Sequence, residues 1–311
     1  MSHAAKTWTA LVTVYVVWGS TYLGIAIARE TIPSLFAAST RFIVAGALMA
    51  IIVRSRGGSL RIPARELATC LLVGCLLPVA NAVVFFAEGT ISTGLASLLI
   101  ASVPLWIVLF RVAARERLPR QLLAGVGIGF VGVAVLAQPS GSAKLAGIAL
   151  SVLAAVMWAT GSVISARLKL PADPFTATTY EMLGGGLVML VPSLFTLHHF
   201  SPSAGSIGGW AYLVLVGSII GYTAYVWLLS NAPLGLVSTY AYVNPIVAIT
   251  LGVLFHGEHL SWRLLSGAAV VVAAVALVVR REPAGRPRIE LEADVVRRDR
   301  DAVELATGRR A

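Results

Sequence analysis

Long apolar runs alternate with short polar connections along most of the chain. Windows of about 20 residues predict ten apolar spans, near residues 8–28, 33–53, 67–87, 94–112, 121–138, 146–167, 175–197, 207–229, 236–256 and 262–280. An α-helix of about 20 residues is needed to cross the ~30 Å hydrocarbon layer of a membrane. Because a backbone in lipid must satisfy its own hydrogen bonds, such spans are expected to be helical. The pattern predicts an all-α integral membrane protein with ten transmembrane helices.

The overall composition agrees with a membrane environment. The chain has 311 residues, of which 58% are hydrophobic and 12% are charged, whereas an ordinary soluble domain is roughly a quarter charged. A net charge of +10 favours a nucleic-acid partner only where the basic residues gather on one face. Here they lie between the apolar runs and in the C-terminal tail. We therefore expect surrounding lipid and no nucleic-acid partner.

Lysine and arginine are distributed unequally between alternate connections. One side carries Lys6, Arg54, Arg56, Arg61, Arg65, Arg111, Arg115, Arg117, Arg120, Arg167, Lys169, Arg280 and Arg281, and the other carries only Arg29, Lys144 and Arg263. Connections rich in these residues stay in the cytoplasm, so both termini are predicted to be cytoplasmic. Residues 282–311 are rich in charge and poor in large apolar residues, and we expect them to form a disordered cytoplasmic tail.

The chain contains an internal repeat. The segment Trp18-Gly-Ser-Thr aligns with Trp158-Ala-Thr-Gly at an offset of 140 residues, and GLASLLIASVP (94–104) aligns with GLVSTYAYVNP (235–245) at 141. Arg115-Glu-Arg-Leu then aligns with Gly257-Glu-His-Leu at 142. We predict two five-span repeats, residues 1–140 and 141–281. Since five is odd, the second repeat is inserted upside down relative to the first, as in many secondary transporters.

Several of these segments resemble the EamA family of the drug/metabolite transporter superfamily. The resemblance is carried by the WGSTYLGIAI opening (18–27), the pair Arg41-Phe42, the small-residue run that ends at Pro104, and the segment VNP (243–245) with Gly257-Glu258 after it. It covers about residues 8–281 and is specific for fold and class rather than for substrate. It implies a multi-pass carrier of the bacterial inner (plasma) membrane with a central cavity built by both halves. Many members export amino acids or other metabolites.

Two prolines lie near the middle of predicted spans at equivalent positions of the repeats. Pro104 is in the fourth span and Pro245 is in the ninth. Proline removes a helical hydrogen bond, which is tolerated in a membrane where the backbone faces protein or a water-filled cavity. We interpret both as cavity-lining helix breaks that act as gates, with a packing kink as the alternative. Asn244 either binds substrate or caps the freed carbonyls.

Aromatic residues at mid-depth form the second candidate feature. A buried tyrosine hydroxyl or indole N–H needs a polar partner, which a solute in a cavity supplies, although packing explains any one of them equally well. Together they suit a small neutral, zwitterionic or aromatic solute. The candidate substrate-binding residues are Trp18, Tyr22, Asn81, Phe85, Trp158, Tyr222, Tyr225, Tyr240 and Asn244.

Charged residues inside the spans are the third feature, because such residues are costly in lipid. Arg41 and Glu181 occupy equivalent positions of the two repeats. Each lies close enough to a span end for its head group to extend to the interface, and a contact between the repeats is equally consistent. Glu88, at the outer end of the third span, is the candidate for proton coupling.

No cofactor or metal site is predicted. Gly127-Ile-Gly-Phe-Val-Gly132 fits a dinucleotide-binding pattern but lies in an apolar span with no preceding strand. His256-Gly-Glu-His259 lacks the spacing of zinc peptidases. Without a nucleotide-binding loop, transport is expected to use a solute or proton gradient.

The sequence therefore predicts a carrier rather than an enzyme. It is expected to move a small metabolite, an amino acid or similar solute, outward by alternating access. The alternatives are a drug or multidrug efflux carrier, a passive channel and a membrane-embedded lipid enzyme. Substrate identity, direction of transport, coupling ion, oligomeric state and the role of the C-terminal tail are left open.

Overall fold

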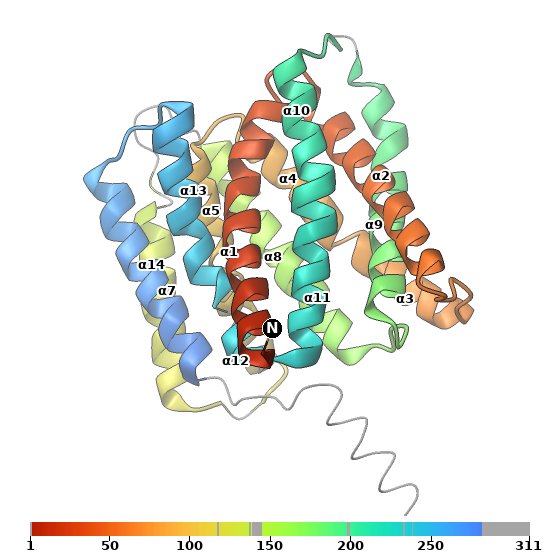
Figure 1. Ribbon diagram of the computed structural model, residues 1–311. Helices are drawn as coiled ribbons and strands as arrows, with labels where there is room; N and C mark the ends of the chain where they lie inside the picture. Colours follow the sequence, from red (N-terminus) through yellow and green to blue (C-terminus); the bar gives the residue numbers. More distant parts are fainter. Residues whose placement is uncertain are drawn as a thin grey trace, which may run out of the picture.

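A computed structural model describes residues 2–116, 118–136, 138, 145–197, 200–232, 234–237 and 239–281. Within these residues all regular structure is helical (Figure 1). The predicted tail, residues 282–311, lies outside the described residues. The helices are α1 (His3–Ala28), α2 (Ser34–Ser55), α3 (Ala64–Gly74), α4 (Leu77–Ala87), α5 (Thr93–Ile100), α6 (Val103–Ala113), α7 (Arg120–Leu136), α8 (Leu145–Arg167), α9 (Pro174–Leu194), α10 (Ala204–Tyr212), the π-helical η2 (Leu213–Ile220), α11 (Gly221–Asn231), α12 (Leu234–Val237), α13 (Tyr240–His256) and α14 (Trp262–Arg281).

Helix is present in each of the ten predicted windows. Among the described residues, six helical stretches are long and apolar enough to cross a membrane: His3–Ala28, Ser34–Ser55, Ala64–Ala87, Thr93–Ala113, Leu145–Ser165 and Ala204–Tyr225. Shorter apolar helices cover Arg120–Leu136, Tyr240–His256 and Trp262–Val278. The all-helical architecture is therefore confirmed and is consistent with a membrane protein, while the count of ten transmembrane helices stays a prediction.

Several of the stretches are interrupted near their middle. Pro78 lies in the first turn of α4, directly after α3 ends, and Pro104 lies in the first turn of α6, directly after the chain leaves α5. A proline fits this place because the first N–H groups of a helix have no intrahelical acceptor. The fourth stretch thus breaks at Ala101-Ser102, just before the predicted proline.

The ninth stretch differs from its prediction. Pro245 lies inside α13, which runs on to His256, while the interruption lies between the end of α12 and Tyr240. Thr239, in this interruption, donates its hydroxyl to the Leu236 carbonyl at 2.5 Å and is hydrogen-bonded to the Tyr15 hydroxyl. The stretch is thus interrupted next to Thr239, before Tyr240, and not at the proline.

Equivalent helices of the two predicted repeats pack against each other, α2 against α9 and α7 against α14 (Figure 1). A Cβ atom added to Gly46 would lie 2.8 Å from Leu183 Cγ, and one added to Gly186 would lie 2.8 Å from Ile43 Cγ1. With an offset of 140, Gly46 corresponds to Gly186 and Ile43 corresponds to Leu183, so each contact is the repeat equivalent of the other. Contacts that exchange in this way are expected across a two-fold axis.

The second pair repeats the relation at an offset of 142. A Cβ atom added to Gly125 would lie 3.1 Å from Val278 Cγ2, and one added to Gly267 would lie 2.5 Å from Leu136 Cδ2. Small residues of this kind allow helices in a membrane to approach closely.

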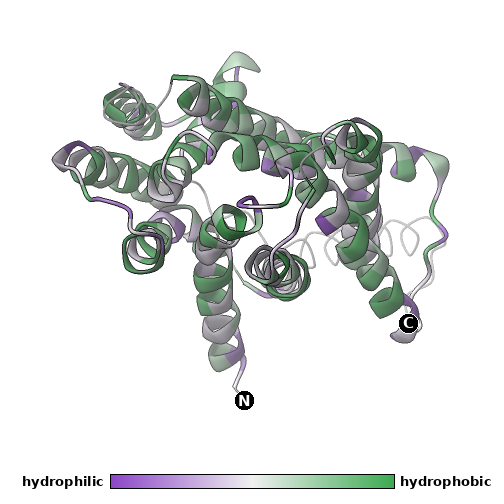
Figure 2. Ribbon diagram, turned by 90° about the horizontal axis from the view of Figure 1, so that it is seen from above, coloured by the Kyte–Doolittle hydropathy of each residue, from purple (hydrophilic) through white to green (hydrophobic). Residues whose placement is uncertain are grey.

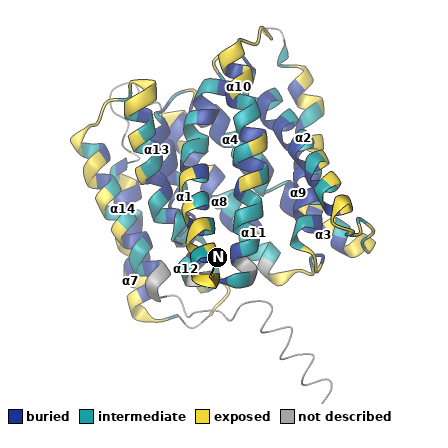
Figure 3. Cartoon of the chain, in the orientation of Figure 1, coloured by how far each residue is buried: buried dark blue, intermediate teal, exposed yellow. Residues whose placement is uncertain are grey.

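The outer surface of the helices is apolar. Most of the helical ribbon is hydrophobic when it is seen from above (Figure 2). Buried residues face the middle of the molecule, and exposed ones lie on the outer faces and at the ends (Figure 3). The exposed side chains include Val191 (63%), Phe255 (70%) and Trp262 (87%). An apolar exterior of this extent suits contact with lipid tails.

The contact between α3 and α9 provides a stability test. A Cβ atom at Gly185 would meet the carbonyl oxygen of Gly74 and lie 2.6 Å from Pro78 Cβ. We expect Gly185→Ala to lower the free energy of unfolding by about 1–3 kcal/mol, because α3 and α9 must move apart. Nothing lies within 4 Å of a Cβ at Gly127, so Gly127→Ala is the matched control. Melting followed by size-exclusion chromatography in detergent measures both, and equal melting temperatures would contradict the expectation.

Candidate functional site

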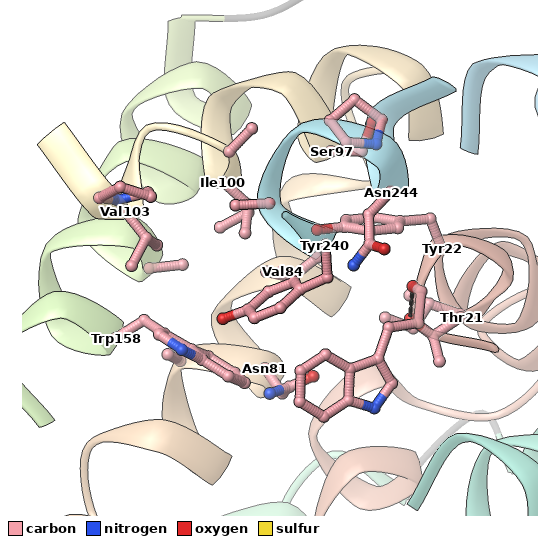
Figure 4. Close-up of a pocket in the computed structure, with 18 of the residues that line it drawn as sticks. Thr21, Tyr22, Asn81, Val84, Ser97, Ile100, Val103, Trp158, Tyr240 and Asn244 are labelled. Carbon is pink, nitrogen blue, oxygen red and sulfur yellow. Dashed lines mark hydrogen bonds between the residues drawn. The ribbon is translucent and has the colours of Figure 1, made fainter. Parts of the chain in front are cut away.

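A cavity lies between helices from both halves of the chain (Figure 4). It contains about 840 Å³ of space free of protein atoms, its open mouth included. Its walls are mostly apolar and aromatic, with a few polar side chains, which is the usual character of a small-molecule site. The lining residues are Trp18, Thr21, Tyr22, Ile25, Arg41, Ala80, Asn81, Val84, Ser97, Ile100, Ala101, Val103, Pro104, Ala154, Trp158, Tyr222, Tyr240, Ala241, Asn244 and Pro245.

Trp18 is the centre of an aromatic cluster. Its ring centroid lies 4.9 Å from that of Tyr225, 5.1 Å from that of Tyr240 and 5.5 Å from that of Tyr222. The contacts with Tyr222 and Tyr240 are edge-to-face, a favoured geometry for aromatic pairs. A Cβ atom at Gly221 would lie 2.5 Å from the indole nitrogen of Trp18, so the glycine makes room for this ring. Helix α1 and the α11–α13 region therefore share one aromatic wall.

Two carboxamides in the lining are anchored on the backbone. The Asn81 side-chain nitrogen donates to the Leu77 carbonyl at 3.3 Å. The side-chain nitrogen of Asn244, oriented toward two neighbouring carbonyls, donates to the Tyr240 carbonyl at 3.2 Å and to the Tyr15 carbonyl at 3.3 Å. Asn244 therefore both caps carbonyls and lines the cavity, although the capped carbonyls are not the one that Pro245 frees. Figure 4 shows both side chains at the cavity.

Arg41 is the one charged residue in the lining. The residue is only 3% exposed, and its Nε donates to Ser218 Oγ at 3.1 Å. Its guanidinium carbon lies 4.9 Å from the centroid of the Phe42 ring. Within the described part of the chain Nη1 has no hydrogen-bond partner. The side chain thus points inward and reaches across to η2, which agrees with a contact between the two halves rather than with extension to the membrane surface.

The other predicted residues are less directly placed. Phe85 does not line the cavity; it is fully buried and packs in the core with Phe42. The cavity face of α4 is made by Ala80, Asn81 and Val84. Tyr225 stands behind Trp18 and is not in the lining, and neither is Glu181 of α9.

Two hydroxyl-bearing lining residues were not predicted. Thr21 and Ser97 both belong to the aligned repeat segments, and helical spacing would have placed Thr21 near Trp18.

Glu88 caps the C-terminus of α4 and is 7% exposed. Neither carboxylate oxygen has a hydrogen-bond partner among the described residues. The charges that act on it are those of Glu258 and Arg29. A buried carboxylate without hydrogen bonds is costly in its ionised form.

Within the described residues, no cluster of three or more His, Cys, Asp or Glu side chains is suited to hold a metal ion.

A family model for EamA-like transporters matches residues 6–138 and 145–280. The chain belongs to the EamA-like transporter family. It is 36% identical over 274 residues to the uncharacterized inner membrane transporter YedA of Escherichia coli (strain K12), covering 86% of this chain and 89% of that protein. It is 25% identical over 279 residues to a probable amino-acid metabolite efflux pump of Salmonella typhimurium (strain LT2), covering 84% and 91%.

A solved structure, a crystal structure of a protein, has a TM-score of 0.63 at 22% sequence identity and covers 90% of this chain and 99% of its own. It shows a shared fold. The family and the named relatives agree that this EamA-family chain is a membrane transporter, which confirms the predicted class and not a particular substrate.

The aromatic wall can be tested at Trp18. We expect Trp18→Ala to reduce transport roughly tenfold, since each aromatic contact is worth about 0.5–1.5 kcal/mol, while membrane abundance stays near that of the parent. Trp158→Ala, at the equivalent position, should also reduce transport. Trp8 is 58% exposed, and Trp8→Ala is the control. In-gel fluorescence of a fluorescent-protein fusion measures abundance and so distinguishes a role in transport from a role in packing. A parallel loss of abundance and transport would make Trp18 a packing residue.

Proposed function

We propose that this EamA-family protein is a secondary carrier that exports an amino acid or a similarly small metabolite across the bacterial inner membrane. The observation that carries the proposal is the aromatic cavity with one buried arginine in its lining. A guanidinium is suited to bind a carboxylate through two parallel hydrogen bonds. The aromatic and aliphatic walls are suited to an apolar side chain. The name of the Salmonella relative supports the amino-acid class and the outward direction.

In this proposal ten transmembrane helices form two inverted repeats, residues 1–140 and 141–281. The reciprocal glycine contacts between α2 and α9, and between α7 and α14, support this arrangement. The cavity draws residues from α1, α2, α4, α5, α6, α8, α11 and α13, as a shared site between repeats requires. Rocking of one set of helices against the other would then open it to one side at a time.

We further propose that both termini are cytoplasmic. Several basic residues near one end of the bundle form ion pairs: Lys169 with Glu66 at 3.3 Å, and Arg111 and Arg167 with Glu116 at 2.7 and 3.0 Å. The hydrogen bond from Arg111, with help from Arg167, lowers the pKa of Glu116 below its usual range. The abundance of Lys and Arg in these connections supports a cytoplasmic location for this end.

Flux measurements in liposomes separate the proposal from its rivals. Proteoliposomes loaded with single radiolabelled amino acids should show saturable efflux and counterflow exchange for at least one of them. Exchange of lipophilic dyes without amino-acid exchange would favour a multidrug efflux carrier. Flux that rises linearly with concentration would favour a channel, and lipid turnover without flux would favour an enzyme.

Arg41 gives a sharper test of the proposed solute. We expect Arg41→Gln to lower kcat/KM for the exchanged amino acid roughly 10- to 100-fold, because a hydrogen bond to a charged group is worth about 1.5–3 kcal/mol. Arg41→Lys should lose less, since it keeps the charge and loses the planar fork. Arg61 is exposed, so Arg61→Gln is the control. Unchanged kinetics in Arg41→Gln, at normal abundance, would contradict a role in binding.

Glu88 is the proposed proton-coupling group. Its burial without hydrogen bonds makes its protonation state sensitive to its surroundings. We expect Glu88→Gln, which fixes the side chain as neutral, to flatten the dependence of export on external pH. Counterflow, which needs no net proton movement, serves as the internal control. The same pH profile in the parent and in Glu88→Gln would remove the residue from the coupling mechanism.

A further inference from the structure

The connection between α13 and α14 is bonded to the start of α5. The Glu258 carboxylate accepts hydrogen bonds from the backbone N–H of Thr93 at 2.5 Å and of Gly94 at 3.2 Å. The next N–H, that of Leu95, donates to Ser92 Oγ at 3.2 Å. These N–H groups have no intrahelical acceptor, so two side chains from different parts of the chain satisfy the beginning of α5. A carboxylate is also favoured at the positive end of a helix.

The surrounding backbone leaves room for this carboxylate. A Cβ atom at Gly252 would lie 2.6 Å from Glu258 Oε2. Gly257 ends α13 with a φ of 66°, a left-handed conformation that glycine adopts without strain. The backbone N–H of Glu258 then donates to the Gly252 carbonyl at 3.1 Å. The turn is therefore shaped to direct Glu258 at α5, the helix that carries Ser97 and Ile100 into the cavity wall.

The first repeat contains the same turn with a different partner. Arg115 and Glu116 align with Gly257 and Glu258, and Arg115 also has a positive φ, 60°. The Glu116 carboxylate, however, is paired with Arg111 and Arg167. By the alignment, Gly235 of α12 is the counterpart of Gly94. In Figure 1, α12 lies near the N-terminus, at the end of the bundle opposite the connection from α13 to α14.

We propose that Glu258 is a positioning residue of the transport cycle, a latch whose bonds to Thr93 and Gly94 hold the outer end of α5 closed. This inference rests on the alternating access proposed above. Opening of the outer side separates α5 from the turn and breaks the latch. At the other end of the bundle, the equivalent Glu116 is paired with Arg111 and Arg167 and makes no such latch.

Thiol labelling of a cavity residue tests the latch without knowledge of the solute. Ser97 lines the cavity and is 1% exposed. A Ser97→Cys variant that also carries Cys70→Ala and Cys75→Ala should therefore react slowly with a membrane-impermeant maleimide added outside. We expect Glu258→Gln to raise the labelling rate roughly tenfold, because charge-assisted hydrogen bonds are stronger than those of a neutral carboxamide. Glu116→Gln removes the equivalent carboxylate, which is exposed and paired with arginines, and should leave the rate near that of the parent because exposed ion pairs contribute little.

Two further variants separate the latch from simple fraying of α5. Gly252→Ala displaces the carboxylate but keeps its charge, and it should raise the labelling rate as Glu258→Gln does. Ser92→Ala removes the other cap of the same helix end, and it should leave the rate near that of the parent. An unchanged rate in both Glu258→Gln and Gly252→Ala would overturn the latch. So would an equal rise in Ser92→Ala, or a rise in Glu116→Gln.

Counterflow by the parent protein in proteoliposomes distinguishes failure of the latch from failure of the carrier. Counterflow together with unchanged labelling of Glu258→Gln overturns the latch and leaves the carrier intact. Linear flux by the parent overturns the carrier, and the latch with it.

Discussion

A backbone in lipid has no water to bond with, and side chains of this protein meet that constraint at several helix ends and irregular turns near the cavity. The free N–H groups of α5 bond to Glu258 and Ser92. The side chain of Asn244 reaches two carbonyls beside the start of α13. Ser218, in the π-helical η2, binds Arg41. Several polar groups near the cavity are thus found at helix ends and irregular turns, while other buried polar side chains, such as Ser39 and Thr179, lie within regular helices.

The two kinds of contact between the halves have different mechanical roles. The α2–α9 and α7–α14 pairs meet through glycines whose neighbours leave no room for a methyl group, and such interfaces resist sliding because protein interiors are close-packed. The contacts beside the cavity combine glycine approaches, such as Gly19 against Val247, with a few hydrogen bonds and aromatic edges. A rearrangement that spares the glycine pairs and exchanges hydrogen bonds is the cheaper one, so we expect the paired helices to be the frame and α5 and α13 to move.

Hydropathy predicted the helical stretches well because a membrane span is defined by length and composition, both readable in the sequence. The depth of a residue within its predicted span was also readable from the sequence, and Trp18, Asn81 and Tyr240, which were chosen for their depth, line the cavity. The face of the helix on which a side chain lies was not readable. Phe85, one position beyond the cavity face of α4, is in the core. Thr239, beside the interruption before α13, is hydrogen-bonded to Tyr15 of another helix, a contact that no local pattern contains. The inverted repeat and the roles of the site residues stay predictions.

The energetics of Arg41 and Glu258 are linked if the solute is anionic at one end. A buried guanidinium that keeps an unused donor is costly, and a bound carboxylate would lower that cost. A solute shifts a conformational equilibrium only by the difference between its affinities for the two states. In the proposed cycle, the bonds of Glu258 to α5 set how much tighter the solute must bind the outer-open conformation before that conformation is populated. A latch much stronger than a few charge-assisted hydrogen bonds could not be opened by the binding free energy of one carboxylate and one small side chain. Two bonds from a single glutamate therefore suit the proposed carrier of small solutes.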